Sequence, residues 1–261
     1  MTNILQFYYG TAIFQGTAIN VLFLDTTSTR SEALILTLPA NLGLVFGAML
    51  LICFGNLIGH WKWTLVISFT MMVLFGGLVA MVTPFNKGTM IAFIFLLQTF
   101  FGWAQYESIA FTQLGVPQLD LGMSGGLAGT ARFAGGSLAT AVYTSILTNT
   151  QAAKAAATIP QAAMNAGLSS EAAAQIIPAF ALGAAALQGI PGMTTEILTS
   201  LSLVYKWSYC HALKMVALSS LGFGGLGIVM CLLCENIDAK MNEKTEVFLE
   251  NDVHKEKNTF H

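Results

Sequence analysis

The chain has 261 residues, of which 55% are hydrophobic and only 9% are charged, whereas about a quarter of the residues of a typical soluble domain are charged. Eleven of the 24 charged residues lie between positions 235 and 261, so the first 234 residues carry only 13. Because a soluble protein of this size needs charge over its whole surface, the composition excludes most soluble folds and predicts a polytopic membrane protein with a short hydrophilic tail. The net charge of −2 gives no reason to expect a nucleic-acid partner.

Six stretches are long and apolar enough to cross about 30 Å of hydrocarbon, which takes about 20 helical residues. They lie near Ile4–Leu24, Ala33–Leu57, Trp63–Val82, Met90–Thr112, Leu121–Leu147 and His211–Cys234. The chain is therefore predicted to be an all-α membrane protein with six transmembrane helices. The pattern divides it into helices one to five (1–148), a long Ala-rich helical loop (149–209), helix six (210–234) and a charged tail (235–261).

Lysines in the tail set the predicted orientation, because short loops rich in Lys and Arg stay in the cytosol. The tail carries Lys240, Lys244, Lys255 and Lys257. With the tail in the cytosol, six crossings place the N-terminus and Lys62 there too, and the 149–209 loop outside. The basic residues then placed outside are Arg30, Lys87 and Lys154. Trp61 and Trp63, which flank Lys62, are typical of a membrane interface.

The 149–209 loop is predicted to stay out of the hydrocarbon. A further span at 177–203 is disfavoured because Pro191 and Glu196 would lie inside it. Short amphipathic helices are expected instead, and one of them begins after Ser169, a serine N-cap that precedes three alanines. The stretch from Thr194 is compatible with a helix that continues into the sixth span.

Arg132 is the most informative residue, because an arginine inside a membrane span is costly and usually faces a bundle interior or a wet cavity. At 100° per residue it shares one helical stripe with small residues and a tyrosine: Gly125, Gly129, Gly136, Ala139 and Tyr143. The three glycines would let another helix pack closely or leave room for a solute beside the guanidinium. Arg132 and Tyr143 are therefore predicted to line a substrate cavity. The alternative is that Arg132 extends to the interface or ties two helices together.

The fourth span gives a second polar face. Gln98, Gly102, Gln105 and Thr112 fall on one side of it, which suits the wall of an aqueous cavity or, equally, hydrogen bonds between helices. We predict that Gln98 and Gln105 line the cavity. Glu107 falls on the opposite side beside Trp103, where it is a candidate proton-coupling group or a structural partner.

The first span repeats the pattern, with Tyr8, Thr11 and Gln15 on one face. Tyr8 and Gln15 are predicted to line the same cavity. The sequence offers no metal-ligand cluster, and Cys231-x-x-Cys234 lacks a second Cys or His pair. A Walker motif, a nucleophile elbow and a catalytic triad are also lacking, so no cofactor, no ATP-driven transport and no enzyme is predicted.

Three motifs carry a resemblance to a known family: Gly102-Trp-Ala-Gln-Tyr-Glu-Ser-Ile-Ala-Phe, Leu121-Gly-Met-Ser-Gly-Gly-Leu-Ala-Gly-Thr-Ala-Arg-Phe-Ala-Gly-Gly-Ser and Val142-Tyr-Thr-Ser-Ile-Leu-Thr-Asn. With them the chain resembles the C-terminal half of fungal major facilitator transporters of the trichothecene efflux pump type. These are relatives of the drug:proton antiporters and siderophore transporters. The resemblance implies a secondary transporter that works by alternating access, with substrate bound between two six-helix halves.

In that fold the first, second, fourth and fifth helices of the C-terminal half line the cavity, and the polar faces described above lie on the first, fourth and fifth. The resemblance thus implies proton-coupled export of a small hydrophobic toxin or drug across the plasma membrane or, alternatively, the vacuolar membrane. The N-terminal half and its coupling motifs are expected to be missing, so that half or a second copy would be needed to complete the cavity. Siderophore–iron transport and a truncated, non-transporting membrane protein are the alternatives.

Overall fold

The computed structural model describes residues 38–117, 120–182 and 184–238, so the predicted first span and most of the tail lie outside the described residues. Every regular element in these ranges is helical, which confirms the all-α class. The elements are α4 (Leu38–Ile58), α5 (Trp61–Leu78), the 3-10 helix η1 (Val79–Met81), α6 (Lys87–Leu114), α7 (Leu121–Asn165), α8 (Ser170–Leu182), α9 (Ala184–Gln188) and α10 (Thr195–Leu233).

Four stretches of the described helices are long and apolar enough to cross a membrane: Leu38–Ile58, Trp61–Met81, Lys87–Leu114 and Thr195–Leu233. They overlap the predicted second, third, fourth and sixth spans, and the start of the second span (33–37) lies outside the described residues. The predicted fifth span forms the first part of α7, whose 45 residues exceed the length that a bilayer requires. Its glycines, serines and threonines lower its hydropathy, which is why α7 is not among the four.

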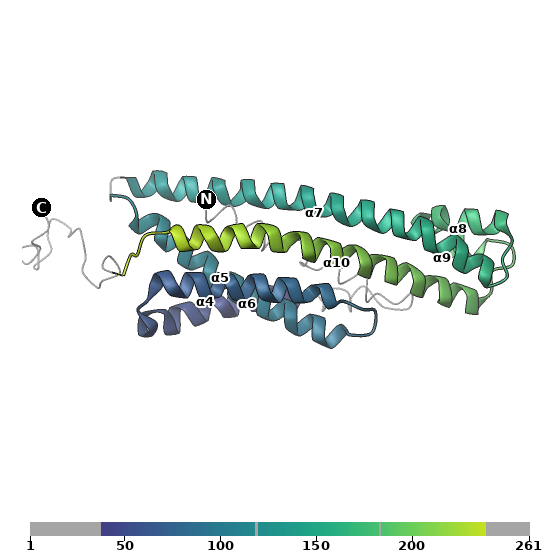
Figure 1. Cartoon of the computed structure of the whole chain (residues 1–261), viewed down its shortest axis with the longest axis horizontal. Helices are drawn as coiled ribbons and strands as arrows, with labels where there is room; N and C mark the ends of the chain where they lie inside the picture. Colours follow the sequence, from purple (N-terminus) through teal and green to yellow (C-terminus); the bar gives the residue numbers. More distant parts are fainter. Residues whose placement is uncertain (1–37, 118–119, 183, 239–261) are drawn as a thin grey trace, which may run out of the picture.

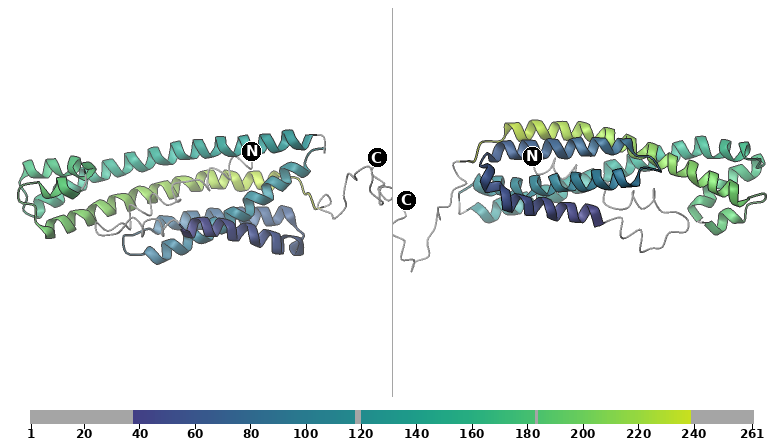
Figure 2. Two further views of the ribbon diagram at one scale, coloured as in Figure 1. Left: turned by 180° about the vertical axis from the view of Figure 1, so that it is seen from behind. Right: turned by 90° about the horizontal axis from the view of Figure 1, so that it is seen from below.

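The helices form two groups of different length (Figure 1). The shorter α4, α5 and α6 lie together beside the long α7 and α10, which run side by side and extend past them to α8 and α9. Figure 2 shows the same arrangement from behind and from below. Within the bundle α4 packs on α6, α5 packs on α6 and α10, and α10 packs on α7.

The extension of α7 and α10 has its own apolar core. Buried side chains from four elements meet there, among them Ile159 of α7, Ile176 of α8, Leu187 of α9 and Leu201 of α10. The main bundle is held by a separate cluster around Leu65, Phe69, Met72, Leu97 and Val216. The described chain is therefore a helix bundle with a smaller packed cap at one end.

Two helix starts in the cap agree with the sequence. The Ser169 hydroxyl accepts a hydrogen bond from the Ala172 amide at 3.3 Å and caps α8. Thr194 caps α10 by accepting from the Ile197 amide at 3.3 Å, and α10 then continues without a break into the sixth span. In contrast, no short helix begins after Leu147, since α7 continues through Pro160 to Asn165. The alanines of 152–157 are strong helix formers and explain this continuation.

Helices α4 and α6 touch through their backbones. A Cβ added at Gly47 would lie 1.8 Å from the carbonyl oxygen of Thr99, and one at Gly43 would lie 2.5 Å from that of Phe95. From the other side, a Cβ at Gly102 would lie 2.2 Å from the carbonyl oxygen of Leu44. Only glycine fits at these contacts, as in other membrane helix pairs that pack through small residues.

The segment after α10 returns to the start of α5. The Asp238 carboxylate accepts a hydrogen bond from the Trp61 amide at 2.9 Å, where a negative charge is favoured by the exposed N–H groups of a helix N-terminus. Ile237 beside it is buried. The end of α10 and the start of α5 are therefore fixed together at the end of the bundle opposite the cap.

Candidate functional site

The structure brings two of the predicted cavity residues together. Arg132 projects from α7 toward Gln105 on α6, and the amide oxygen of Gln105, in the orientation that satisfies both side chains, accepts from the two terminal guanidinium nitrogens at 3.0 and 3.2 Å. Gln105 is only 4% exposed. The pair therefore places a cation and an amide inside the membrane bundle, where it also ties α6 to α7.

The stripe predicted around Arg132 does form one face of α7. Gly136, Ala139 and Tyr143 are buried on that face, whereas Phe133 on the other side is 72% exposed. The Tyr143 ring meets Phe223 of α10 edge-on, with ring centroids 6.2 Å apart. This part of the stripe faces the bundle interior.

At the other end of the stripe the helix face is open. Among the described residues, no atom lies within 4 Å of a Cβ added at Gly125 or Gly129. The close helix contact predicted at these two glycines is thus not made by the described helices, which leave space there instead. The helices are joined nearby by Ser124, whose hydroxyl donates to the Thr112 carbonyl at 2.9 Å.

The predicted amide face of α6 is divided between two neighbours. Gln98 is 1% exposed and lies at the close α4 contact, since its Cβ is 3.1 Å from a Cβ added at Gly43. Gly102 meets the same helix, whereas Gln105 reaches α7. In this conformation Gln98 therefore lies in the packed interior and only Gln105 is beside Arg132.

Glu107 lies between α5 and α6. Its carboxylate accepts a hydrogen bond from the Thr64 hydroxyl of α5 and a second, at 3.0 Å, from the Trp103 indole one turn away on α6. The residue is 1% exposed, and among the described acidic side chains it alone is buried. The proximity of Trp103 follows from the helical spacing, whereas nothing in the sequence indicated Thr64.

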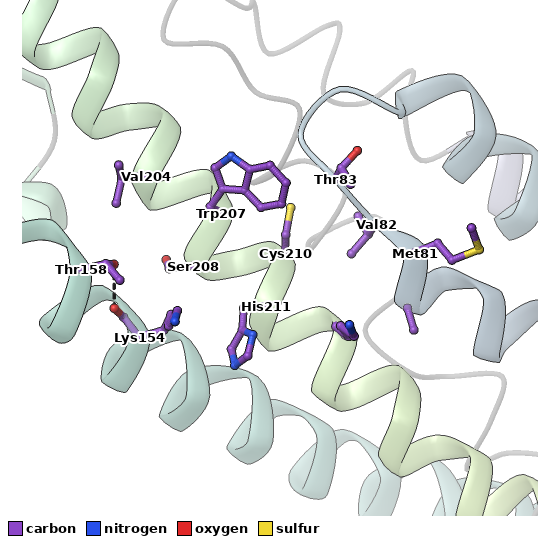
Figure 3. Close-up of a pocket in the computed structure, with 12 residues that line it drawn as sticks. Met81, Val82, Thr83, Lys154, Thr158, Val204, Trp207, Ser208, Cys210 and His211 are labelled. Carbon is purple, nitrogen blue, oxygen red and sulfur yellow. Dashed lines mark hydrogen bonds between the residues drawn. The ribbon is translucent and has the colours of Figure 1, made fainter. Parts of the chain in front are cut away.

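Two predicted cavity residues, Tyr8 and Gln15, lie outside the described residues. The structure instead shows a feature that the sequence did not indicate, a pocket of about 470 Å³ between the α5–α6 connection, α7 and α10 (Figure 3). Its walls carry Lys154, His211 and Lys214. None of the predicted site residues that the structure describes lines it.

Comparison with known proteins connects this arrangement to a family. The profile described as "Fungal trichothecene efflux pump (TRI12)" matches residues 8–259, which is nearly the whole chain. The chain belongs to the fungal trichothecene efflux pump family. It is thus a multi-pass integral membrane protein of the major facilitator type, as the motifs around Arg132 and Glu107 indicated.

Two curated relatives extend this finding. The chain is 41% identical over 242 residues to "MFS-type transporter prx5" of Penicillium rubens. The aligned region covers 93% of the chain and 44% of that protein. It is 23% identical over 223 residues to "Trichothecene efflux pump TRI12" of Fusarium sporotrichioides, covering 85% and 37%. The chain therefore spans less than half the length of these two relatives. No solved structure gives a significant match.

Proposed function

We propose that the chain forms the C-terminal part of a secondary transporter that exports a small hydrophobic toxin or drug in exchange for protons. The observation that carries this proposal is the Arg132–Gln105 pair, a cation held inside a membrane bundle beside an open glycine face. An intramembrane arginine is expensive and is retained chiefly where it serves a substrate or ion pathway. In an alternating-access exporter, a solute in the space beside Gly125 and Gly129 would meet the guanidinium.

The proposed substrate path has two walls. One wall consists of the α7 stripe, which ends at Tyr143, and of Gln105 on α6. Gln98, which is buried against α4 in this conformation, and Gln15 and Tyr8 of the first span are assigned to the same wall. The other wall comes from helices that lie outside this chain or from a second copy of it, because a transporter of this family binds its substrate between two halves. We place the protein in the plasma membrane, with the vacuolar membrane as the alternative, and the α7–α10 cap on the extracytoplasmic side.

Glu107 is the proposed proton-binding group. A carboxyl group that is buried between two helices can alternate between a neutral and a charged form as the helices move and water enters. Its hydrogen bonds to Thr64 and Trp103 would then change with each transport cycle, because a protonated carboxyl group donates one hydrogen bond that a carboxylate cannot.

Efflux of a labelled trichothecene, the substrate class in the family's name, tests the proposal. The protein is expressed from its complete reading frame in cells without toxin exporters, and efflux is measured before and after the proton gradient is collapsed. Collapse is expected to stop efflux. In Glu107→Gln, which keeps the size of the side chain, gradient-driven efflux is expected to disappear while downhill equilibration of the toxin persists.

The matched control is Glu196→Gln, which changes an exposed acid in the first turn of α10 and is expected to export normally. Normal gradient-driven efflux by Glu107→Gln would assign Glu107 a structural role alone. If the protein takes up a labelled ferric siderophore and does not export the toxin, it is a siderophore–iron transporter. A correctly folded protein that moves neither compound would favour a non-transporting membrane protein.

A further inference from the structure

The pocket between the α5–α6 connection, α7 and α10 is basic. Lys154 of α7 and His211 of α10 reach into the space between these two helices (Figure 3), and Lys214 lies one turn further along α10. Trp207, His211 and Lys214 follow at spacings of four and three residues, so they share one face of α10. No acidic side chain is among the described residues that line the pocket.

The remaining walls are divided between hydroxyl groups and apolar surface. Thr158 and Ser208 lie near the basic side chains, and their hydroxyls donate to the carbonyls of Lys154 and Tyr205 at 2.8 and 2.7 Å. Met81, Val204 and Trp207 provide apolar walls. A ligand that fits this division has an anionic group at one end and a hydrocarbon part at the other. The lysine and histidine side chains are donors that suit phosphate oxygens.

The position of the pocket along the membrane normal indicates which anionic ligand can reach it. The helical stretch Trp61–Met81 has 21 residues, so it is about 32 Å long, close to the roughly 30 Å of the hydrocarbon core. Residues at its end, Met81 to Thr83, form one wall of the pocket. Trp207, which is 45% exposed there, is the residue type that prefers the headgroup level.

We propose that this pocket binds the phosphate group of a phospholipid headgroup, with the glycerol and first acyl carbons against Met81, Val204 and Trp207. The phosphate lies among Lys154, His211 and Lys214. Such a lipid would join the α5–α6 connection to α7 and α10 where the cap begins. The proposal does not depend on the proposed transport activity, since binding is measured without substrate or gradient.

Tryptophan fluorescence of the purified chain tests the proposal, because Trp207 lies in the pocket wall. The probes are soluble dihexanoyl phosphatidylglycerol, dihexanoylglycerol without phosphate, and inorganic phosphate. Saturable binding is expected for the phospholipid, with much weaker binding of the other two. Lys154→Gln and Lys214→Gln are each expected to weaken phospholipid binding about five-fold, the effect typical of one lysine at a charged membrane surface.

The control is Lys87→Gln, which removes an exposed lysine at the start of α6 that does not line the pocket. Its phospholipid affinity is expected to stay unchanged. Equal weakening by Lys87→Gln, or equal binding of dihexanoylglycerol, would overturn the phosphate site. If inorganic phosphate binds as tightly as the phospholipid, the pocket is a site for a free anion, and the proposal that its ligand is a lipid is overturned.

Discussion

Gly47→Ala is expected to separate α4 from α6 and to leave most of the protein unfolded or aggregated in detergent. The new Cβ would lie 1.8 Å from the carbonyl oxygen of Thr99, and a backbone atom cannot rotate away as a side chain can. The two helices must therefore move apart along the whole line of contact that includes Gly43 and Gly102. Overpacking costs about 1–3 kcal/mol and occasionally more, and a backbone clash belongs at the upper end. Thermal unfolding and the monodisperse fraction measure the effect.

Gly126→Ala is the matched control for this prediction. Gly126 lies within a helix, is exposed, and has no described atom within 4 Å of an added Cβ. Alanine is preferred over glycine inside a helix by up to about 1 kcal/mol, so the unfolding temperature is expected to stay the same or rise. A Gly47→Ala protein that unfolds at the temperature of the unchanged protein would show that α4 and α6 do not meet through Gly47.

Arg132→Ala is expected to reduce toxin efflux by the complete transporter at least ten-fold. Hydrogen bonds that involve a charged group contribute about 1.5–3 kcal/mol, which corresponds to roughly a 10- to 100-fold change in rate. Arg132→Lys keeps the charge but cannot make the forked pair with Gln105, so an intermediate rate is expected. Gln105→Ala leaves the guanidinium in place and is expected to have the smaller effect.

Efflux rates are compared at equal amounts of folded protein at the cell surface, so that a loss of expression is not counted as a loss of transport. Lys87→Ala, which removes an exposed lysine at the start of α6, is expected to keep the unchanged rate. If Arg132→Ala exports as fast as Lys87→Ala, the arginine serves only to tie α6 to α7.

The features that sequence alone predicted are those that depend on one helix at a time. The stripe through Arg132, Gly136 and Tyr143 follows from a fixed rotation per residue, and the structure buries its Gly136–Tyr143 part. The caps at Ser169 and Thr194 follow from hydroxyl side chains placed at helix starts. Each of these inferences needs no knowledge of the neighbouring helix.

Features that depend on which helices meet were not predictable in the same way. Gly43 and Gly47 have the Gly-x-x-x-Gly spacing of a packing motif, but the spacing does not say that α6 is the partner. Thr64 lies 43 positions before Glu107, and only the packing of α5 on α6 brings the two together. Conversely, Gly125 and Gly129 looked suited to close packing, and the described helices leave them open.

The basic pocket likewise could not be predicted from the sequence. Lys154, His211 and Lys214 each have an ordinary position in the sequence, near the end of an apolar stretch. They converge only because α7 and α10 continue beyond the bundle side by side, and the length of α7 depended on the alanines that follow its predicted end. A pocket built from three separate elements carries no local signal.

The most direct test of the substrate path is whether water and substrate reach the open face of α7. The background protein carries Cys53→Ser and Cys234→Ser, which removes the two free cysteines that are not buried. A charged maleimide is then applied to Gly129→Cys and, as a control, to Leu127→Cys. Leu127 lies nearly opposite Gly129 at the same depth and is 64% exposed on the outside of the bundle. Thiols react as thiolates in water and not in hydrocarbon. We expect the thiol at position 129 to be labelled, more slowly when toxin is present, and the thiol at position 127 to stay unlabelled. If the thiol at position 129 is not labelled, or if toxin does not slow its labelling, the result contradicts a substrate path beside Arg132.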